Sequence, residues 1–443
     1  MGTLITLGQF FLSLSILVIL HECGHFFPAK WFKTKVEKFY LFFDPGFSLF
    51  KYKKGETEYG IGWLPFGGYV KIAGMIDESF DKEQMSGPIQ DWEFRAKPAW
   101  QRLIIMLGGV TVNFMLGILI FAGIFMNWGD AYLPTENATY GIAVEELGEN
   151  LGLESGDKII SVGDKAITKL YPNNLVKEIV INEARSINVL RNNQTTTLTI
   201  NDDIAQTLSS YANKDKIVYT PRMPVVIARL APDMPAKNAG LQVDDQILKV
   251  NGEETFFYDQ FNEAVDSYVN AKAILTILRA TDTLNVDVTF NENGKLGFNP
   301  YSWQKFFEAE RTEYGFGQAL TAGYNKSMDF LSSQLKAFGQ MFRGKMDVRE
   351  SVGGPITIAT MFGSTWDWLQ FWNLTASLSI ILAFMNLLPI PGLDGGHVLF
   401  LLWELITGRK ASDRVVEYAT MAGFILLLGL MAAIFWIDLA RLF

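Results

Sequence analysis

Four stretches of the chain are long and apolar enough to predict transmembrane helices. They span residues 2–20, 103–128, 368–393 and 418–437, and none of them contains a charged side chain. A helix crosses the hydrocarbon core of a bilayer with about 20 apolar residues, which each stretch supplies. The first stretch lacks the basic n-region and the small-residue cleavage site of a signal peptide, so we expect a retained helix.

Two further patterns lie outside these stretches. Residues 34–76 mix glycine, proline and alternating aromatic residues, which predicts strands beside the first helix. In residues 315–342, apolar side chains recur every three or four positions, which predicts an amphipathic helix. We interpret this helix as lying on the membrane surface, although a helix packed on soluble domains fits the same pattern.

The segment between the second and third apolar stretches contains an internal repeat. Residues 150–162 align with residues 238–250, and residues 189–191 align with 277–279 at the same offset of 88. A constant offset over so long a stretch indicates a duplicated domain. Each copy has a Gly-Leu turn and then an Asp-led strand with alternating apolar residues, so we expect two α/β domains.

Composition narrows the classes of protein that fit. The chain has 443 residues, 49% of them hydrophobic, and a formal net charge of −9, which argues against nucleic-acid binding. Its single cysteine, Cys23, can form no intrachain disulfide. Lys and Arg concentrate in the loop 28–102 and at 409–414, whereas residues 127–156 contain none. Because cytoplasmic loops carry excess Lys and Arg, we expect both basic loops in the cytoplasm and residues 129–367 on the other side.

Candidate chemistry begins at the end of the first apolar stretch, in the motif His21-Glu22-Cys23-Gly24-His25. Two histidines four residues apart on a helix project from one face, so both can bind one zinc ion. Glu22 can then act as general base on the zinc-bound water. The chain has only three histidines, so this spacing is not expected by chance.

A catalytic zinc ion needs a third protein ligand, and no further histidine follows soon after the motif. Asp394 and His397 are the candidates, and the charge argument puts Asp394 at the cytoplasmic end of the third stretch. A lone carboxylate at that depth needs a cation as its partner. The surrounding run, residues 386–396, contains two prolines and three glycines, so we expect the helix to break there.

The two motifs together resemble those of the site-2 protease family of intramembrane zinc metalloproteases. Members carry HExxH on one transmembrane helix and NxxPxPxLDG on a later one, and both are present here, at residues 21–25 and 386–395. The resemblance implies that zinc is the cofactor and that His21, His25 and Asp394 bind it, which leaves a supporting or structural role for His397. The implied catalytic base is Glu22, and the implied substrate-binding residues are Asn386, Pro389, Pro391, Gly67 and Gly68.

The second repeat, with Ala-Gly-Leu at 239–241 and Val-Asn-Gly at 250–252, resembles a PDZ domain, and the first copy matches more weakly. Tandem PDZ-like domains resemble the sigma-E-regulating bacterial branch of the family.

We therefore expect a polytopic α-helical membrane protein with four transmembrane helices, a cytoplasmic-face β-element and two tandem PDZ-like α/β domains outside the membrane. The expected parts are transmembrane helix 1 (1–27), a cytoplasmic-side loop with a membrane-associated β-element (28–102), transmembrane helix 2 (103–128), PDZ-like domains (129–221 and 222–300), an amphipathic helix with a Gly-Pro segment (301–367), and transmembrane helices 3 (368–396) and 4 (415–437).

The resemblance also implies an activity and a place in the cell. Substrates would be single-span membrane proteins, such as trimmed anti-sigma factors and remnant signal peptides, that an upstream site-1 protease has already cut. The enzyme would span the lipids of the bacterial inner membrane, with its active site toward the cytoplasm and its PDZ-like domains in the periplasm. An edge of the 34–76 sheet could receive the unwound substrate as an added strand. The PDZ-like pair could exclude substrates that still carry a bulky extracytoplasmic domain.

Three other interpretations stay open from the residues alone. A membrane-tethered zincin-type protease acting on soluble or misfolded proteins shares the histidine motif but requires a third ligand soon after it. A non-enzymatic PDZ scaffold leaves His21, Glu22 and Asp394 unexplained. An ion or proton transporter would usually show inverted repeats of its membrane half, which this sequence does not suggest.

Overall fold

The computed structural model describes residues 2–75, 87–171, 174–213 and 216–441, and it divides the chain into two compact units. The first unit comprises Met1–Gly129, Glu313–Leu335 and Val352–Phe443, and the second comprises Asp130–Thr312 and Lys336–Ser351. Part of the loop expected at 28–102, residues 76–86, lies outside the described residues.

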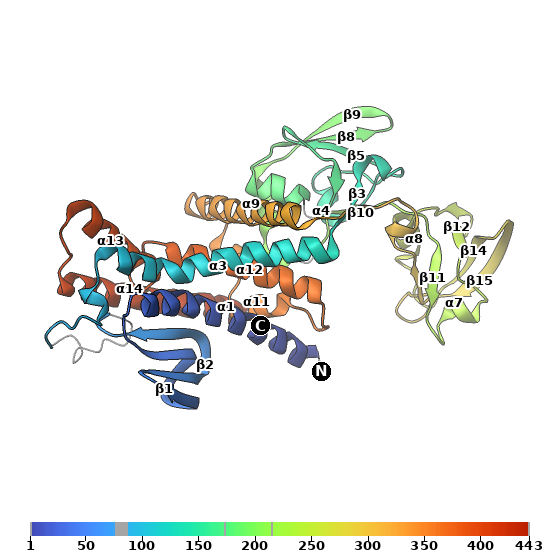
Figure 1. Ribbon diagram of the computed structural model, residues 1–443. Helices are drawn as coiled ribbons and strands as arrows, with labels where there is room; N and C mark the ends of the chain where they lie inside the picture. The colour runs from blue at the N-terminus through green and yellow to red at the C-terminus, as the bar shows by residue number, and fades with distance from the viewer. Residues whose placement is uncertain (1, 76–86, 172–173, 214–215, 442–443) are drawn as a thin grey trace. The chain divides into compact units, whose positions relative to one another are not determined.

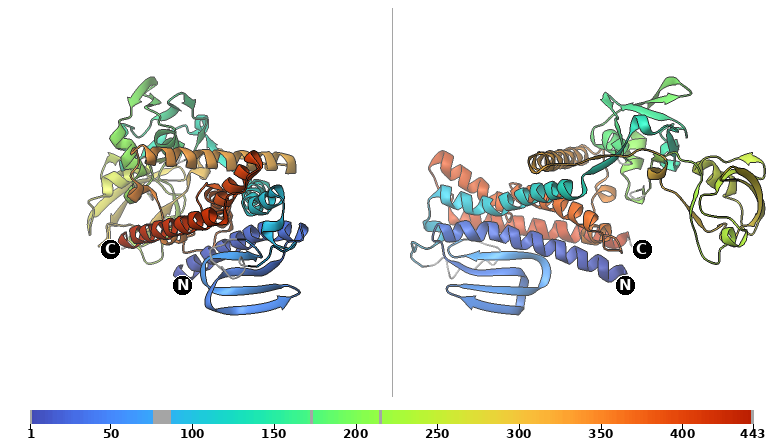
Figure 2. Two further views of the ribbon diagram at one scale, coloured as in Figure 1. Left: turned by 90° about the vertical axis from the view of Figure 1, so that its left-hand side faces the viewer. Right: turned by 45° about the vertical axis from the view of Figure 1, so that its right-hand side comes forward.

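Helices of the first unit are the candidate membrane spans. Among the described residues, four helices are long and apolar enough to cross a bilayer: Gly2–Trp31, Ala99–Trp128, Trp368–Leu387 and Arg414–Ala440. They correspond to α1 (Gly2–Trp31), α3 (Ala99–Trp128), α12 (Trp368–Leu387) and α14 (Asp413–Ala440). Both α1 and α12 pack along α3, and the ribbon views show α1 and α3 side by side (Figures 1 and 2). This architecture is that of an integral membrane protein.

Small and polar side chains hold these helices together. A Cβ on Gly108 of α3 would stand 1.8 Å from the Gly24 carbonyl oxygen of α1, so the two backbones touch where the helices cross. Buried hydroxyls add hydrogen bonds, with Ser13 Oγ 2.9 Å from Thr375 Oγ1. Because lipid gives little hydrophobic drive for helices to associate, close backbone packing and interhelical hydrogen bonds do that work.

The third apolar stretch is interrupted, as its prolines and glycines at 386–396 predict, so residues 368–396 do not form one helix. Helix α12 ends at Leu387, and a separate helix, α13 (Asp394–Thr407), begins after the six-residue loop 388–393. The intervening loop folds back tightly, since a Cβ on Gly395 would stand 2.2 Å from the Leu388 carbonyl oxygen. It also lies against α14, where a Cβ on Gly423 would overlap the Pro391 carbonyl oxygen. Proline and glycine in this run therefore end one helix and start the next.

The far end of α14 is fixed by a carboxylate. Asp438 is buried and accepts hydrogen bonds from Gly354 N at 3.0 Å, Ile356 N at 2.9 Å and Thr357 Oγ1 at 2.6 Å. These backbone groups form the start of α11 (Pro355–Met361), so Asp438 satisfies the free N–H groups of that helix. The Gly-Pro segment expected before the third helix is thereby tied to the last helix.

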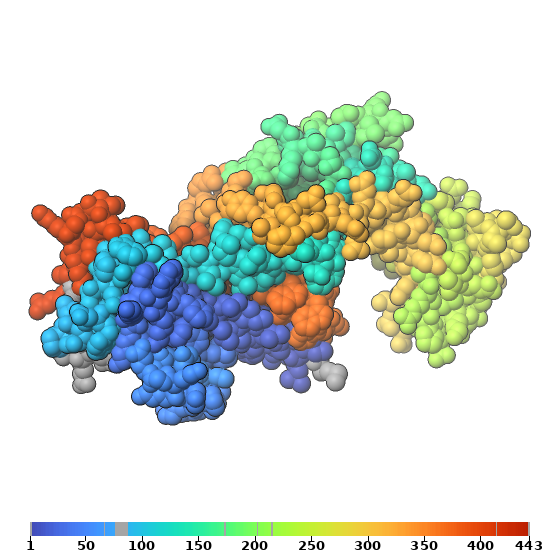
Figure 3. Space-filling model, viewed as in Figure 1, coloured from blue at the N-terminus to red at the C-terminus, as the bar shows by residue number. Residues whose placement is uncertain are grey.

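Strands follow α1 as expected, in a hairpin of β1 (Val36–Lys54) and β2 (Thr57–Ile72) that projects beside α1 (Figures 1 and 3). Residues 38–41 of β1 pair with two parts of β2, residues 58–61 and residues 68–71. The hairpin is therefore folded on itself, and the segment 68–71 pairs on one side only among the described residues. Its other side pairs with no strand in the described part of the chain, and we call it the open edge; the Val70 N–H donates a hydrogen bond to the Glu22 carboxylate.

Helix α9 (Phe316–Phe342) covers the segment expected to be amphipathic. Gly323 packs against α3, since a Cβ there would stand 2.6 Å from the Ile118 carbonyl oxygen. Phe316 and Tyr324 of the same helix are exposed. The helix therefore combines a packed face with an apolar exposed one.

The second unit contains two four-stranded sheets with the same strand order. One is β6-β5-β8-β9 and the other is β13-β12-β14-β15. Their bounds are β5 (Lys158–Val162), β6 (Lys165–Ala166), β8 (Ser186–Arg191), β9 (Gln194–Thr199), β12 (Gln246–Val250), β13 (Glu253–Glu254), β14 (Lys272–Arg279) and β15 (Asp282–Thr289). Each sheet has its own hydrophobic core, around Ile159 and Ile187 in the first and Ile247 and Leu275 in the second.

Equivalent ion pairs occur at the same place in both sheets. Arg191 Nη2 lies 2.7 Å from Asp157 Oδ2, and Arg279 Nη2 lies 2.6 Å from Asp245 Oδ2. The two pairs are related by the sequence offset of 88, and the hydrogen bond to Asp245 raises the pKa of the Arg279 guanidinium. The remaining strands and short helices are β3 (Asp130–Pro134), β4 (Ile142–Val144), β7 (Lys169–Leu170), β10 (Tyr219–Pro221), β11 (Ile227–Leu230), β16 (Phe298–Pro300), β17 (Glu310–Thr312), α4 (Glu146–Glu149), α5 (Asn174–Val176), α6 (Asp202–Ser209), α7 (Pro235–Asn238), α8 (Tyr258–Val265) and α10 (Val348–Ser351).

Candidate metal centre

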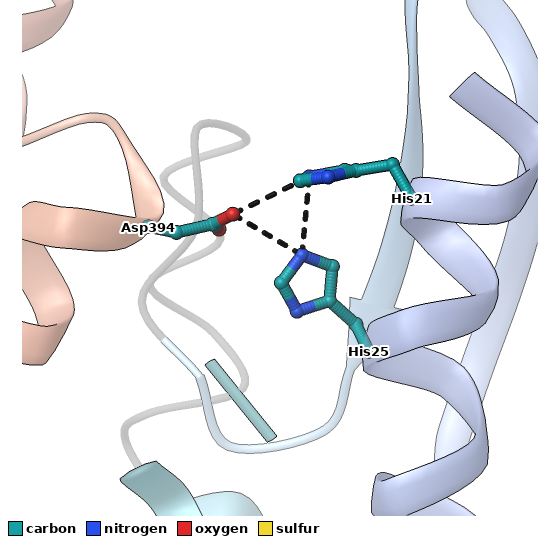
Figure 4. A group of neighbouring side chains, drawn as sticks. All are labelled: His21, His25 and Asp394. Carbon is teal, nitrogen blue, oxygen red and sulfur yellow. Dashed lines mark hydrogen bonds and ion pairs between the residues drawn. The ribbon is translucent and has the colours of Figure 1, made fainter. Parts of the chain in front are cut away.

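Three side chains that are far apart in the sequence meet at one point in the first unit. Asp394 Oδ2 lies 3.3 Å from His21 Nε2 and 3.3 Å from His25 Nε2, and the two nitrogens are 3.2 Å apart. Figure 4 shows both imidazoles reaching from α1 toward the carboxylate, which comes from the first residue of α13. Among the described residues, these three form the group of His, Cys, Asp or Glu side chains able to share a metal ion.

The spacing of this group fits zinc. Two ligand atoms at about 2.0–2.1 Å from a tetrahedral zinc ion stand about 3.3–3.4 Å apart, which matches the sides of this triangle. Asp394 Oδ2 is also buried without a hydrogen bond, which is costly for a carboxylate unless a cation pairs with it. Two imidazoles and one carboxylate are a donor set found in catalytic zinc sites.

Helix α3 makes room for the two imidazoles. A Cβ on Gly109 would stand 2.3 Å from His25 Nε2 and 2.6 Å from His21 Cε1. Gly24, inside the histidine motif, has a Gly108 backbone oxygen only 2.4 Å from where its Cβ would lie. The glycines therefore let α3 pass close enough to cover the site.

The other nitrogen of each imidazole faces α3. His25 Nδ1 lies 2.8 Å from the Ile105 carbonyl oxygen, and His21 Nδ1 lies 3.3 Å from the Asn113 side-chain amide. Such contacts orient a ligating histidine so that its second nitrogen points at the metal.

The loop between α12 and α13 supplies the other half of the site. Asn386, in the last turn of α12, has Nδ2 3.3 Å from His21 Nε2, so it stands beside the candidate metal position. Pro389 and Pro391 lie in the loop, where Pro391 contacts Gly396 of α13 and Gly423 of α14. The tight loop thus sets the position of Asp394 at the start of α13.

Glu22 is nearly buried and lies next to the open edge of the hairpin. A Cβ on Gly68 of β2 would stand 2.6 Å from Val18 Cγ1 and 3.4 Å from Glu22 Cγ. The neighbouring Gly67 has a left-handed φ of +147° and lies against the Phe43 ring instead. Of the two glycines expected at the substrate, Gly68 therefore lies nearer to Glu22.

His397 does not join the triangle. It lines a cavity together with Arg102 and Glu404, whose side chains form an ion pair of 2.5 Å. The structure thus separates the two candidates for third ligand: Asp394 faces the histidines and His397 faces this cavity.

The sequence motifs do not indicate the contribution of α3. Gly108, Gly109 and Asn113 shape or contact the site, and none of them belongs to either motif. A signal was available, because an amide in the middle of an otherwise apolar membrane stretch is costly and therefore usually has a purpose.

The sequence is similar to that of known membrane proteases. The model of peptidase family M50 matches residues 9–430. A protein of Vibrio cholerae named as a zinc metalloprotease is 28% identical over 468 residues, covering 98% of each chain. The "Regulator of sigma E protease" of Haemophilus influenzae is 28% identical over 460 residues, covering 100% of each chain. The "Regulator of sigma-E protease RseP" of Escherichia coli is 28% identical over 464 residues, covering 98% of each chain. The chain therefore belongs to peptidase family M50 and is an integral-membrane metalloendopeptidase of the site-2 protease type, with zinc as its cofactor.

Proposed function

We propose that this chain is an intramembrane endopeptidase of single-span membrane proteins, in which His21, His25 and Asp394 hold the zinc ion. The observation that carries the proposal is the 3.3 Å separation between Asp394 Oδ2 and each histidine Nε2. It favours an intramembrane protease over a zincin-type enzyme, since the third donor comes from the break between α12 and α13 and not from the segment after the motif.

A zinc ion held by His21, His25 and Asp394 would supply a Lewis acid for the scissile carbonyl and would lower the pKa of a water molecule to about 7. Glu22 accepts the proton of the attacking water and delivers it to the leaving amine. Two observations support this role: Glu22 lies between the two histidines in sequence, and its carboxylate interacts electrostatically with the three candidate ligands.

The substrate must unwind before attack, because a helix hides its carbonyl groups in its own hydrogen bonds. We assign its docking to the open edge at residues 68–71 of β2, where an extended strand can add to the sheet. Gly68 supports this assignment, since it has no side chain between that edge and Glu22. Asn386, with Pro389 and Pro391 fixing the loop after it, holds the substrate backbone from the other side.

The setting of the enzyme is proposed from charge and from the relatives. Basic loops at 28–102 and 409–414 favour an active site toward the cytoplasm of a bacterial inner membrane, with the second unit in the periplasm. The names of two relatives, "Regulator of sigma E protease" and "Regulator of sigma-E protease RseP", suggest which substrates this enzyme cleaves. These would be anti-sigma factors and remnant signal peptides, after a first cut by a site-1 protease. The repeated strand order and ion pairs of the second unit support two PDZ-like domains.

Replacing Glu22 by Gln tests the mechanism, with a trimmed single-span substrate in detergent or liposomes. We expect cleavage to fall by about 10²–10⁴-fold, because the general base is lost, while the bound zinc stays at the wild-type level. The matched control is Glu56→Gln, at an exposed carboxylate that pairs with Lys30, and it should cleave normally. Cleavage by Glu22→Gln at the wild-type rate would rule out this role of Glu22.

A further inference from the structure

The helix opposite the histidine motif carries a buried amide that the proposed mechanism does not use. Asn113 lies on α3, one turn after Gly109, and has no solvent exposure. Its side-chain amide lies 3.3 Å from His21 Nδ1. Its backbone carbonyl accepts a separate hydrogen bond of 2.7 Å from Ser379 Oγ of α12.

Two roles can keep such an amide in a membrane helix. It can join helices as a polar contact, or it can serve the metal site. The contact between α3 and α12 uses the Asn113 backbone oxygen and would survive replacement of the side chain. The side chain itself has His21 as its hydrogen-bond partner in the part of the chain that the structure describes.

The chemistry of a metal-bound histidine decides which amide atom faces His21. An imidazole that binds a metal through Nε2 is neutral, so its proton is on Nδ1 and needs an acceptor. For His25 this acceptor is the Ile105 carbonyl oxygen, 2.8 Å from Nδ1. For His21 the atom in the same position belongs to the Asn113 amide, whose oxygen and nitrogen occupy the same shape in either orientation.

In the orientation with Nδ2 toward His21, the Asn113 Oδ1 atom is buried with no hydrogen bond, and two donors face each other whenever His21 carries its proton on Nδ1, as zinc binding through Nε2 requires. Rotation of the amide by 180° turns this clash into an Nδ1–H to Oδ1 hydrogen bond. We propose that Asn113 Oδ1 accepts the Nδ1 proton of His21, and that Asn113 thereby acts as a positioning residue that keeps His21 Nε2 free for zinc. This inference rests on the zinc site proposed above and adds a residue to it.

The test measures zinc affinity of the full-length protein in detergent, by competition with a chelator, without reference to proteolysis. Asn113→Leu keeps the volume but removes the acceptor, and we expect its zinc affinity to fall about 10–100-fold. Asn113→Asp keeps an acceptor in place, and its affinity should stay at or above the wild-type value. The absorption spectrum of the Co²⁺-substituted protein should change in Asn113→Leu and not in Asn113→Asp.

Ser379→Ala is the matched control, because it removes the helix contact to Asn113 and leaves the side chain of Asn113 intact. Its zinc affinity should equal that of the wild type. Should Asn113→Leu fail to fold, Asn113→Ala replaces it with the same expectation. Wild-type affinity in the Leu or Ala variant, or an equal loss in Asn113→Asp, would overturn the assignment. The zinc site proposed above is tested separately, because His21→Ala and Asp394→Ala must each lose zinc affinity if these residues bind the ion.

Discussion

Gly109 of α3 lies directly against the metal-facing edge of His25, so that a Cβ on Gly109 would stand 2.3 Å from His25 Nε2. The same Cβ would stand 2.9 Å from His21 Nδ1. One missing methyl group therefore leaves the space in which both imidazoles turn toward Asp394. The backbone of α3 is a wall of the metal site, although it contributes no metal ligand.

Substitution of Gly109 by Ala should consequently damage zinc binding. Overpacking of this kind costs about 1–3 kcal/mol, which corresponds to a loss of zinc affinity of about tenfold or more. Gly123→Ala is the control on the same helix, because a Cβ there meets no atom within 4 Å. Chelator competition on both purified variants measures the difference, and equal zinc affinities would contradict the close approach of Gly109.

Removal of zinc should lower the stability of the first unit. The three proposed donors come from α1 and α13, so a shared ion would link these helices, and its loss leaves the buried Asp394 carboxylate and the two imidazoles without the divalent charge between them. Zinc at 100 times its Kd contributes about 2.7 kcal/mol, so chelation should lower the Tm by about 5 °C or more. Thermal unfolding in detergent, with and without chelator, measures this shift.

Two variants tell whether the third ligand is the aspartate. Asp394→Ala should unfold at the same temperature with and without chelator. His397→Ala should keep the wild-type shift, since His397 faces the cavity with Arg102 and Glu404 instead of the metal position. A lost shift in His397→Ala together with a retained shift in Asp394→Ala would reverse the assignment.

The paired arginines of the second unit should each stabilise their own sheet. Asp245 is fully buried and its partner Arg279 binds it through both Nε and Nη2, at 2.7 and 2.6 Å. Arg279→Ala leaves that carboxylate buried without its cation, which costs about 3 kcal/mol. Hydrogen exchange of the full-length chain should show faster exchange in β12 and β14 and unchanged exchange in β5 and β8.

The equivalent change in the first sheet, Arg191→Ala, should give the reverse pattern, because Asp157 is as buried as Asp245. Lys249→Ala serves as control, since its 3.5 Å pair with Glu254 is exposed and contributes at most about 1 kcal/mol. Equal effects of Arg279→Ala and Lys249→Ala on hydrogen exchange would show that the buried ion pair stabilises its sheet no more than the exposed one does.

The second unit should restrict which substrates reach the site, if its PDZ-like domains act as a size filter. Replacing Asp130–Thr312 by a short flexible linker should raise cleavage of a single-span substrate that keeps its bulky extracytoplasmic domain. Cleavage of the trimmed substrate, the control, should stay constant. If the bulky substrate is cleaved no faster after the deletion, the filter hypothesis fails.

Much of the membrane half could be predicted from the sequence, because the relevant signals are local. About 20 apolar residues in a row are enough to predict a span, and the described part of the chain contains four such helices. The spacing of His21 and His25 on one helix likewise needs only the helical repeat. The strands beside α1 and the helix at 316–342 followed from their apolar periods.

The sequence repeat at an offset of 88 extends to specific side-chain contacts, because each copy forms the same Asp–Arg ion pair. Asp157 with Arg191 and Asp245 with Arg279 occupy equivalent places in sheets of the same strand order. A repeat in the sequence predicts a repeat in the structure, because the same side chains at equivalent positions make the same contacts.

Sequence by itself thus determined the two candidate metal-binding motifs, the apolar spans and the duplication. Only the tertiary structure decided which of Asp394 and His397 faces the histidines, because the direction of a side chain at a broken helix depends on how the loop from Leu388 to Leu393 turns. It also revealed α3 as the wall of the site. The sequence of α3 alone does not explain Gly109 and Asn113. Their role becomes clear only from their contacts with the two imidazoles of α1, where the helices cross.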